Sequence, residues 1–170
     1  MGVLTDEMSA EPVFRRATRN DVVEIVRLLA DDPLGAKRER YVQPLPASYY
    51  AAFDRIDSDP NNELVVVELE GSVVGTLQLT YIPYLTYEGG TRALIEGVRI
   101  DTRLRSSGLG RRLFTWAIER ATACGCHVLQ LTSDKLRPDA IRFYESLGFS
   151  ATHEGMKLHL PRSAANANAT

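Results

Sequence analysis

Apolar positions along this 170-residue chain follow two periods, one that strands favour and one that helices favour. Alternating or β-branched runs predict strands at residues 13–16, 64–69, 73–81, 92–100, 128–132, 149–151 and 156–160. Apolar residues three and four apart predict four helices. The first follows a cap at Asn20 or Asp21, the second opens at Pro46 and Ser48, and the others run from about Gly108 to Cys124 and from Asp139 to Leu147. This order of elements predicts an α/β sheet of mixed strand direction.

The chain has no linker-like stretch, so we expect one domain. Residues 12–161 carry all the predicted elements. Residues 1–11 are polar and without pattern, which predicts a flexible leader, and the low-complexity residues 162–170 are expected to be disordered.

The composition is that of an ordinary globular protein, with 44% apolar and 25% charged residues. No apolar run approaches the roughly 20 residues of a membrane helix, and the N-terminus lacks the pattern of a signal peptide. The formal net charge of −2 gives no general attraction to nucleic acid or to an anionic membrane. We therefore expect a cytoplasmic protein that has neither of these as a partner.

Cys124, Cys126 and His127 are spaced like metal ligands, but a closed zinc site needs four ligands and the other two histidines stand alone. Two cysteines are also too few for a disulfide framework. We expect reduced thiols and no metal.

The charged residues are unevenly distributed, because five arginines lie between residues 99 and 112 and only Asp101 opposes them there. These arginines are Arg99, Arg103, Arg105, Arg111 and Arg112. The same segment holds small serine and glycine residues between a predicted strand and a predicted helix. The free N–H groups at the start of a helix, with small side chains around them, suit a bound phosphate. A solvated basic surface is the alternative.

Two common phosphate-binding loops do not fit this segment. The Walker loop needs Gly-Lys-Ser/Thr after four spacer residues, and the chain has no such sequence. The dinucleotide fingerprint needs a third glycine where Leu113 stands, and it follows the first strand of a β-α-β unit rather than a series of hairpins.

Residues 105–110 read Arg-Ser-Ser-Gly-Leu-Gly and resemble the Arg-x-x-Gly-x-Gly loop with which the GNAT N-acetyltransferases bind the pyrophosphate of acetyl-CoA. Residues 139–149, ending in Phe-Tyr-Glu-Ser-Leu-Gly-Phe, resemble the second hallmark of that family. The order of elements also agrees from Val13 to Leu160. The resemblance implies a GNAT-like fold, with a mixed, mostly antiparallel sheet of about six to seven strands and about four flanking helices.

The resemblance implies that acetyl-CoA binds as a co-substrate where the strand at 92–100 separates from the strand at 128–132. Gly97, inside the first of these strands, independently predicts a β-bulge. The family's asparagine before the last helix is replaced by Arg137, so we expect Ser133 or Asp134 to supply that contact. The expected cofactor-binding residues are Val98, Arg99, Ile100, Arg105, Ser106, Ser107, Gly108, Leu109, Gly110, Arg111, Ser133, Ala140 and Phe143.

Two side chains are candidates for proton transfer. Glu96 lies just before the predicted bulge and is expected to take a proton from the amine, directly or through water. Tyr144 lies at the family's position for the general acid, and a phenol with an ordinary pKa near 10 is protonated at pH 7. The alternatives are a surface or ion-paired glutamate and a core aromatic ring. A backbone N–H near Val98 is the expected oxyanion donor.

The resemblance places the acceptor pocket between the first two helices, their loop and the hairpin loop before the cofactor strand. The expected substrate-binding residues are Arg38, Tyr41, Tyr84 and Tyr87. Core packing is the alternative for the tyrosines. An aromatic, mildly polar pocket suits a small primary amine or a peptide.

The predicted function is transfer of an acetyl group from acetyl-CoA to such an amine by direct attack in a ternary complex, without a metal. The alternative is a non-catalytic acyl-CoA-binding regulatory module, which needs the loop but neither Glu96 nor Tyr144. Homodimers are common among proteins that this chain resembles, and the predicted terminal strands permit one here.

Overall fold

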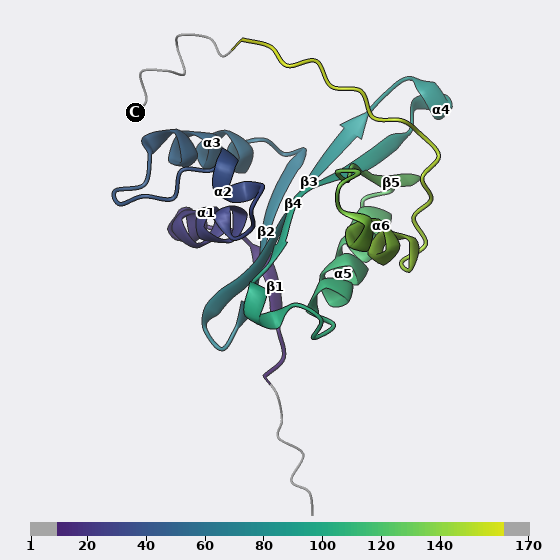
Figure 1. The fold of residues 1–170 in the computed structure, drawn as a ribbon. Coiled ribbons are helices and arrows are strands. Elements are labelled where there is room, and N and C mark those ends of the chain that lie inside the picture. The colour runs from purple at the N-terminus through teal and green to yellow at the C-terminus, as the bar shows by residue number, and fades with distance from the viewer. Residues whose placement is uncertain (1–9, 162–170) are drawn as a thin grey trace, which may run out of the picture.

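The computed structural model describes residues 10–161, which form one sheet with helices on both faces (Figure 1). The strands are β1 (Val13–Arg16), β2 (Asn62–Leu69), β3 (Ser72–Pro83), β4 (Thr91–Ile100) and β5 (Val128–Leu131). The α-helices are α1 (Val22–Ala30), α2 (Gly35–Arg38), α3 (Ala47–Ser58), α4 (Thr86–Gly89), α5 (Leu109–Ala123) and α6 (Pro138–Glu145). Short 3-10 helices are η1 (Arg19–Asp21) and η2 (Thr102–Leu104). Residues 1–9 of the predicted leader and the whole predicted tail lie outside the described residues.

The strands lie in the sheet in chain order, β1-β2-β3-β4-β5. Neighbours are antiparallel from β1 to β4, whereas β4 and β5 are parallel. A parallel pair needs a crossover connection, which α5 provides. The predicted α/β fold with a mixed, mostly antiparallel sheet is therefore confirmed.

In the described part of the chain the sheet has five strands, not six to seven. The strands predicted at 149–151 and 156–160 are wrong, since residues 149–161 have no regular secondary structure. Met156, Leu158 and Leu160 are 97%, 86% and 76% exposed. Their alternation with polar residues fits one face of a strand, but a strand also needs a neighbouring edge, and this segment pairs with none among residues 10–161.

The four predicted helices correspond to α1, α3, α5 and α6. The remaining two, α2 and α4, are single turns of four residues in segments that the sequence predicted as loops. Inside α4, Tyr87 and Glu88 have φ angles of +54° and +58°, so this element is a tight left-handed turn between β3 and β4.

Two buried clusters hold the helices against the two faces of the sheet. On one face, Leu113 and Phe114 of α5 pack against Leu77 of β3. On the other face, Phe53 of α3 packs against Val66 of β2, together with the apolar side of α1. Figure 1 shows α1, α2 and α3 on one side of the sheet and α5 and α6 on the other. Because both faces are covered, the central strands are apolar on both sides.

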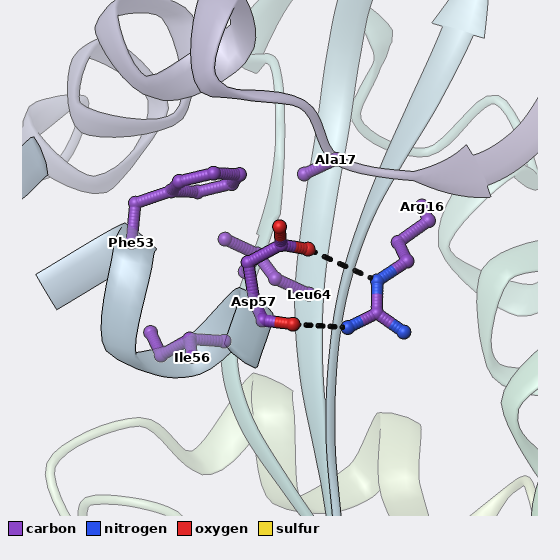
Figure 2. Close-up of a pocket in the computed structure, with 6 residues that line it drawn as sticks. All are labelled: Arg16, Ala17, Phe53, Ile56, Asp57 and Leu64. Atoms are coloured by element: carbon purple, nitrogen blue, oxygen red, sulfur yellow. Dashed lines mark hydrogen bonds and ion pairs between the residues drawn. The ribbon is translucent and has the colours of Figure 1, made fainter. Parts of the chain in front are cut away.

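Figure 2 shows a polar contact that fastens α3 to β1. The Arg16 guanidinium donates to Asp57 Oδ1 at 3.3 Å and to the Asp57 carbonyl at 3.1 Å. Phe53, Ile56 and Leu64 lie beside it, and the space they enclose is too small for a water molecule. We therefore assign this contact a structural role.

A second polar contact fixes the start of α1. The buried Asp21 carboxylate accepts hydrogen bonds from Arg15 Nη1 at 2.8 Å, from Arg15 Nη2 at 2.9 Å and from the Thr18 N–H at 2.7 Å. The bonds from Arg15 are the main reason why the pKa of Asp21 falls from its ordinary 3.8 to about 2. The folded state therefore favours the ionised form of this carboxyl.

We expect Asp21→Asn to lower the free energy of unfolding by about 1–2 kcal/mol at pH 7. Because the folded pKa lies below the unfolded one, the carboxylate stabilises the fold above about pH 4, and this is lost as the pH falls towards 2. Urea unfolding measures the free energy of unfolding of the wild type and of Asp21→Asn. The difference between the two proteins should be smaller near pH 2 than at pH 7. The control is Asp54→Asn, whose exposed ion pair with Arg19 should contribute below about 0.5 kcal/mol. If the two proteins differed in free energy of unfolding by the same amount at pH 7 and near pH 2, the stabilising role of the ionised Asp21 carboxylate would be contradicted.

Candidate active site

β4 has a partner on both sides over only part of its length. Residues 92–95 pair with residues 128–131 of β5, and β5 then ends. In the part of the chain that the structure describes, the rest of β4 is paired with β3 alone. On the β5 side, residues 96–100 therefore have no neighbouring strand among residues 10–161, and we call this unpaired edge the β4–β5 gap. A gap at this point is what the family resemblance implied.

A bulge in β4 lies where the gap begins. Glu96 opposes Gln78 and Arg99 opposes Thr76, so Gly97 and Val98 together oppose the single residue Leu77. Gly97 has a φ of +63°, which a glycine adopts without strain. The bulge predicted from Gly97 is confirmed, and beyond it the strand presents a different set of side chains to each face of the sheet.

The side chains after the bulge divide between the two faces. Val98 and Ile100 pack against the cluster formed with α5 and α6. Arg99 lies on the opposite face, where its guanidinium is 3.4 Å from Asp32 in the loop between α1 and α2. The end of β4 thus has α5 and α6 on one face and the α1–α2 loop on the other.

The predicted pyrophosphate loop lies directly after η2. Ser106 and Gly108 have left-handed φ angles of +64° and +86°, and Gly108 caps α5. Among the described residues, the N–H groups of Ser106, Gly108, Gly110 and Arg111 have no backbone acceptor. A Cβ atom at Gly108 would meet nothing within 4 Å, so the loop is open to a ligand. Such a set of free donors at a helix N-terminus fits a phosphate.

The predicted pyrophosphate loop lies beside α6 and the end of β4. A Cβ atom on Gly110 would lie 3.6 Å from the Phe143 ring and 3.9 Å from the Ile100 side chain. Of the other predicted cofactor-binding residues, Leu109, Ser133 and Ala140 are buried or half-buried, whereas Ser107 and Arg105 are exposed. The structure thus brings the expected loop residues and Phe143 of α6 together.

The arginines around the loop are less free than the sequence indicated, because acidic or polar groups from other elements meet them. Arg112 pairs with Glu11, and Arg111 Nη2 donates to Ser146 Oγ at 2.9 Å. Arg105 Nη2 donates to the Asp31 carbonyl at 3.3 Å. The basic segment is thus partly neutralised by contacts that local sequence could not reveal.

Asp101 is the anchor between β4 and the loop. Its carboxylate is 2% exposed and accepts hydrogen bonds from Arg103 Nε and Nη2, both at 2.9 Å, and from Arg27 Nη2 of α1 at 3.1 Å. The bonds from Arg103 hold the pKa of Asp101 well below its usual range. The carboxylate therefore stays ionised and ties α1, β4 and η2 together at the entrance of the loop.

The two candidates for proton transfer lie on elements that border the gap. Glu96 is exposed at the start of the bulge, and its side chain makes no hydrogen bond or ion pair within residues 10–161. Tyr144 is half-buried in α6, with its ring 5.4 Å from that of Phe114. Burial raises the pKa of Tyr144, and the nearby charges of Arg137 and Arg99 only partly oppose this. The phenol is therefore protonated at neutral pH, as a proton donor must be.

The predicted substrate-binding residues do not come together. Tyr84 and Tyr87 form an aromatic cluster with His127, in which Tyr84 Oη lies 2.6 Å from His127 Nε2. His127 bonds to Thr91 at the start of β4, five residues from Glu96 and so roughly 16 Å along the strand. Tyr41 and Arg38 are exposed near α2, and Arg38 pairs with Glu39 at 2.8 Å.

Asp32 is a site residue that sequence reasoning missed. Its Oδ1 accepts hydrogen bonds from the N–H groups of Leu34 at 2.9 Å and Gly35 at 2.6 Å. A Cβ atom on Gly35 would lie 2.0 Å from the Leu29 carbonyl oxygen, so only glycine permits this turn. The sequence Asp-Pro-Leu-Gly at residues 32–35 is typical of a turn, but nothing in it indicates that Asp32 reaches Arg99.

Comparison with known proteins agrees with this geometry. The model of the acetyltransferase (GNAT) family matches residues 23–149. The glucosamine 6-phosphate N-acetyltransferase of Trypanosoma brucei brucei is 34% identical over 90 residues, which span 53% of this chain and 59% of that protein. Matches to the curated relatives span 51–61% of those proteins' own lengths.

Two solved structures extend the similarity over most of the described fold. A structure from Bacillus halodurans C-125, named a transcriptional regulator, is 55% identical, has a TM-score of 0.86 and covers 88% of this chain and 100% of its own. A structure from Agrobacterium tumefaciens, named a putative acetyltransferase, is 26% identical, has a TM-score of 0.77 and covers 87% and 99%. Because the family model matches well over half of this chain, the chain belongs to the acetyltransferase (GNAT) family.

Proposed function

We propose that this protein transfers the acetyl group of acetyl-CoA to the primary amine of a small molecule. The observation that carries the proposal is the β4–β5 gap with the open N–H loop at its end, both formed by residues that the family resemblance had singled out. The glucosamine 6-phosphate N-acetyltransferase among the relatives, whose name states a small-molecule amine, supports an acceptor of that size.

The loop residues fit the cofactor because they offer backbone N–H groups that have no backbone acceptor among the described residues. Backbone N–H groups of Ser106, Gly108 and Gly110 would hold the pyrophosphate, and the unpaired edge of β4 would bind the extended arm. Acetyl-CoA supplies an acetyl group activated as a thioester. In the transfer a C–N bond forms and the C–S bond breaks, while the amine loses one proton and the sulfur gains one.

The remaining residues would manage these two protons and the charge on the carbonyl oxygen. Glu96, exposed at the start of the gap, would accept the proton of the amine. The Tyr144 phenol would donate to the departing sulfur. The Val98 N–H within the bulge would stabilise negative charge on the carbonyl oxygen.

The second candidate is a non-catalytic acyl-CoA-binding regulator. The name given to the 55% identical structure from Bacillus halodurans C-125 favours it. Both candidates require the loop, but only the enzyme requires Glu96 and Tyr144. Turnover with tight cofactor binding supports the enzyme, and tight binding without turnover across a broad panel of amines supports the regulator.

We expect the wild-type protein to bind acetyl-CoA in calorimetry, and Gly108→Asp to weaken this binding at least about 30-fold by placing a carboxylate among the N–H donors. The matched control is Gly125→Asp. Gly125 is also left-handed, with φ +74°, and a Cβ atom there would meet nothing within 4 Å, but it follows the other end of α5. It carries the same backbone strain and should leave the Kd unchanged. Equal binding by Gly108→Asp, or no binding by the wild type, would contradict the proposed loop.

We expect Glu96→Gln and Tyr144→Phe each to lower kcat by about 100-fold, the usual size of a lost general base or acid. Their Kd for acetyl-CoA should stay within about twofold of the wild type, because neither side chain belongs to the loop. Steady-state rates with an accepted amine and calorimetry with acetyl-CoA measure the two effects separately. If both variants turn over like the wild type, the assigned proton-transfer roles are wrong.

A further inference from the structure

Arg99 is a buried guanidinium whose hydrogen bonds are incompletely satisfied. Its side chain is 11% exposed, and its Nε is fully buried without a hydrogen-bond partner among residues 10–161. Nη1 donates to the Val98 carbonyl at 2.7 Å, and Nη2 lies 3.4 Å from Asp32 Oδ2. Burial lowers the pKa of Arg99, which reflects the cost of holding its charge away from water. An uncompensated buried donor of this kind calls for an additional acceptor.

The surroundings of Arg99 carry excess positive charge. The charge of Arg137, at the start of α6, acts on Asp32, Arg99 and Tyr144 alike, so Arg137 lies near all three. Asp32 is the opposing carboxylate, and its Oδ1 is already occupied by the Leu34 and Gly35 N–H groups. Among the described residues only Arg99 lies within ion-pair distance of Asp32, so the charge of Arg137 has no paired carboxylate there.

Other charged residues near Arg99 do not remove this excess of positive charge. Arg38 and Glu39 also act on Arg99, but they pair with each other at 2.8 Å. The Glu39 carboxylate additionally accepts a hydrogen bond from Tyr49 Oη at 3.1 Å. These two residues thus leave the excess positive charge at Arg99 and Arg137 in place.

The geometry separates Arg99 from the pyrophosphate loop. Gly110 of the loop approaches Ile100, which lies on the α5–α6 face of β4. The Arg99 side chain lies on the other face, against the α1–α2 loop. An anion bound at Arg99 is therefore distinct from the phosphates that the loop would hold.

We propose that the acceptor amine carries an anionic group, a phosphate, phosphonate or carboxylate, and that Arg99, assisted by Arg137, binds it. The inference rests on the proposed function and names the substrate class of the same site. Glu96 and Arg99 are three residues apart on β4, so their backbones are at most about 10 Å apart. A small molecule with its amine a few bonds from its anion can contact both.

The first test measures anion binding without turnover. The full-length protein is saturated with coenzyme A, which fills the loop, and is then titrated with inorganic phosphate in a calorimeter. We expect saturable millimolar binding that weakens at least about 10-fold in Arg99→Gln, with partial recovery in Arg99→Lys. Arg55→Gln, an exposed arginine of α3, is the control and should bind like the wild type. No phosphate binding, or equal binding by Arg99→Gln, would overturn the proposal.

The second test compares kcat/KM for phosphoethanolamine, β-alanine and ethanolamine, which carry a phosphate, a carboxylate and no anion. We expect kcat/KM of the wild type to be at least about 10-fold higher for an anionic amine than for ethanolamine. The better substrate of phosphoethanolamine and β-alanine then shows whether the site prefers a phosphate or a carboxylate. Arg99→Gln should reduce the preference for an anionic amine to about twofold. The acetyl-CoA Kd should stay unchanged, because the cofactor contact expected of residue 99 is made by its backbone and its side chain lies at Asp32. Equal rates for all three amines, or a preference that survives in Arg99→Gln, would overturn the proposal.

The two tests separate failure of the inference from failure of the proposed function. Acetylation without anion preference and without phosphate binding sinks the anionic acceptor but leaves the acetyltransferase. Phosphate binding that depends on Arg99, with no turnover across the broad panel of amines, rules out the acetyltransferase and leaves an anion site for a regulatory ligand.

Discussion

The backbone of β4 after Ile95 sets the main constraint on the molecule, because its hydrogen-bonding groups on one side have no strand beside them among the described residues. Backbone N–H and C=O groups must bond to something. The Val98 carbonyl accepts a hydrogen bond from Arg99 Nη1, and water or a ligand has to satisfy the groups that stay unpaired. The covered faces of the sheet hold β4 in place while the bulge at Gly97 redirects its side chains. An extended ligand can therefore add to β4 as a further strand would, with its reactive end at the bulge.

Asp101 explains why a segment so rich in arginine forms a defined loop. A buried carboxylate that holds Arg27 and Arg103 fixes the exit of β4 against α1 and so sets the direction in which the loop begins. Several arginines are thereby committed to structure, and their charge is partly neutralised. Arg99 differs from them, since within residues 10–161 it is buried with one long ion pair and its Nε has no hydrogen-bond partner.

Features decided by short-range sequence were predictable. β1 has the predicted bounds, the bulge follows from one glycine inside a strand, and the loop and last helix follow from two short motifs. The strand predicted at 156–160 failed because pairing depends on a neighbouring edge and not on alternation alone. The meeting of Asp32 with Arg99 joins segments 67 residues apart, which a single sequence does not reveal. The distance of Tyr84 from the gap was hidden for the same reason, since it depends on where His127 packs.

The most direct measurement is amide hydrogen exchange of the full-length protein with and without acetyl-CoA, followed by mass spectrometry of peptides. We expect added protection in residues 96–100 and 105–111, because a ligand in the β4–β5 gap would occupy those N–H groups. The turn at residues 84–90 should exchange at the same rate in both samples. Protection confined to residues 84–90 and the peptide containing His127, with none in β4 or the loop, would contradict the gap as the cofactor site.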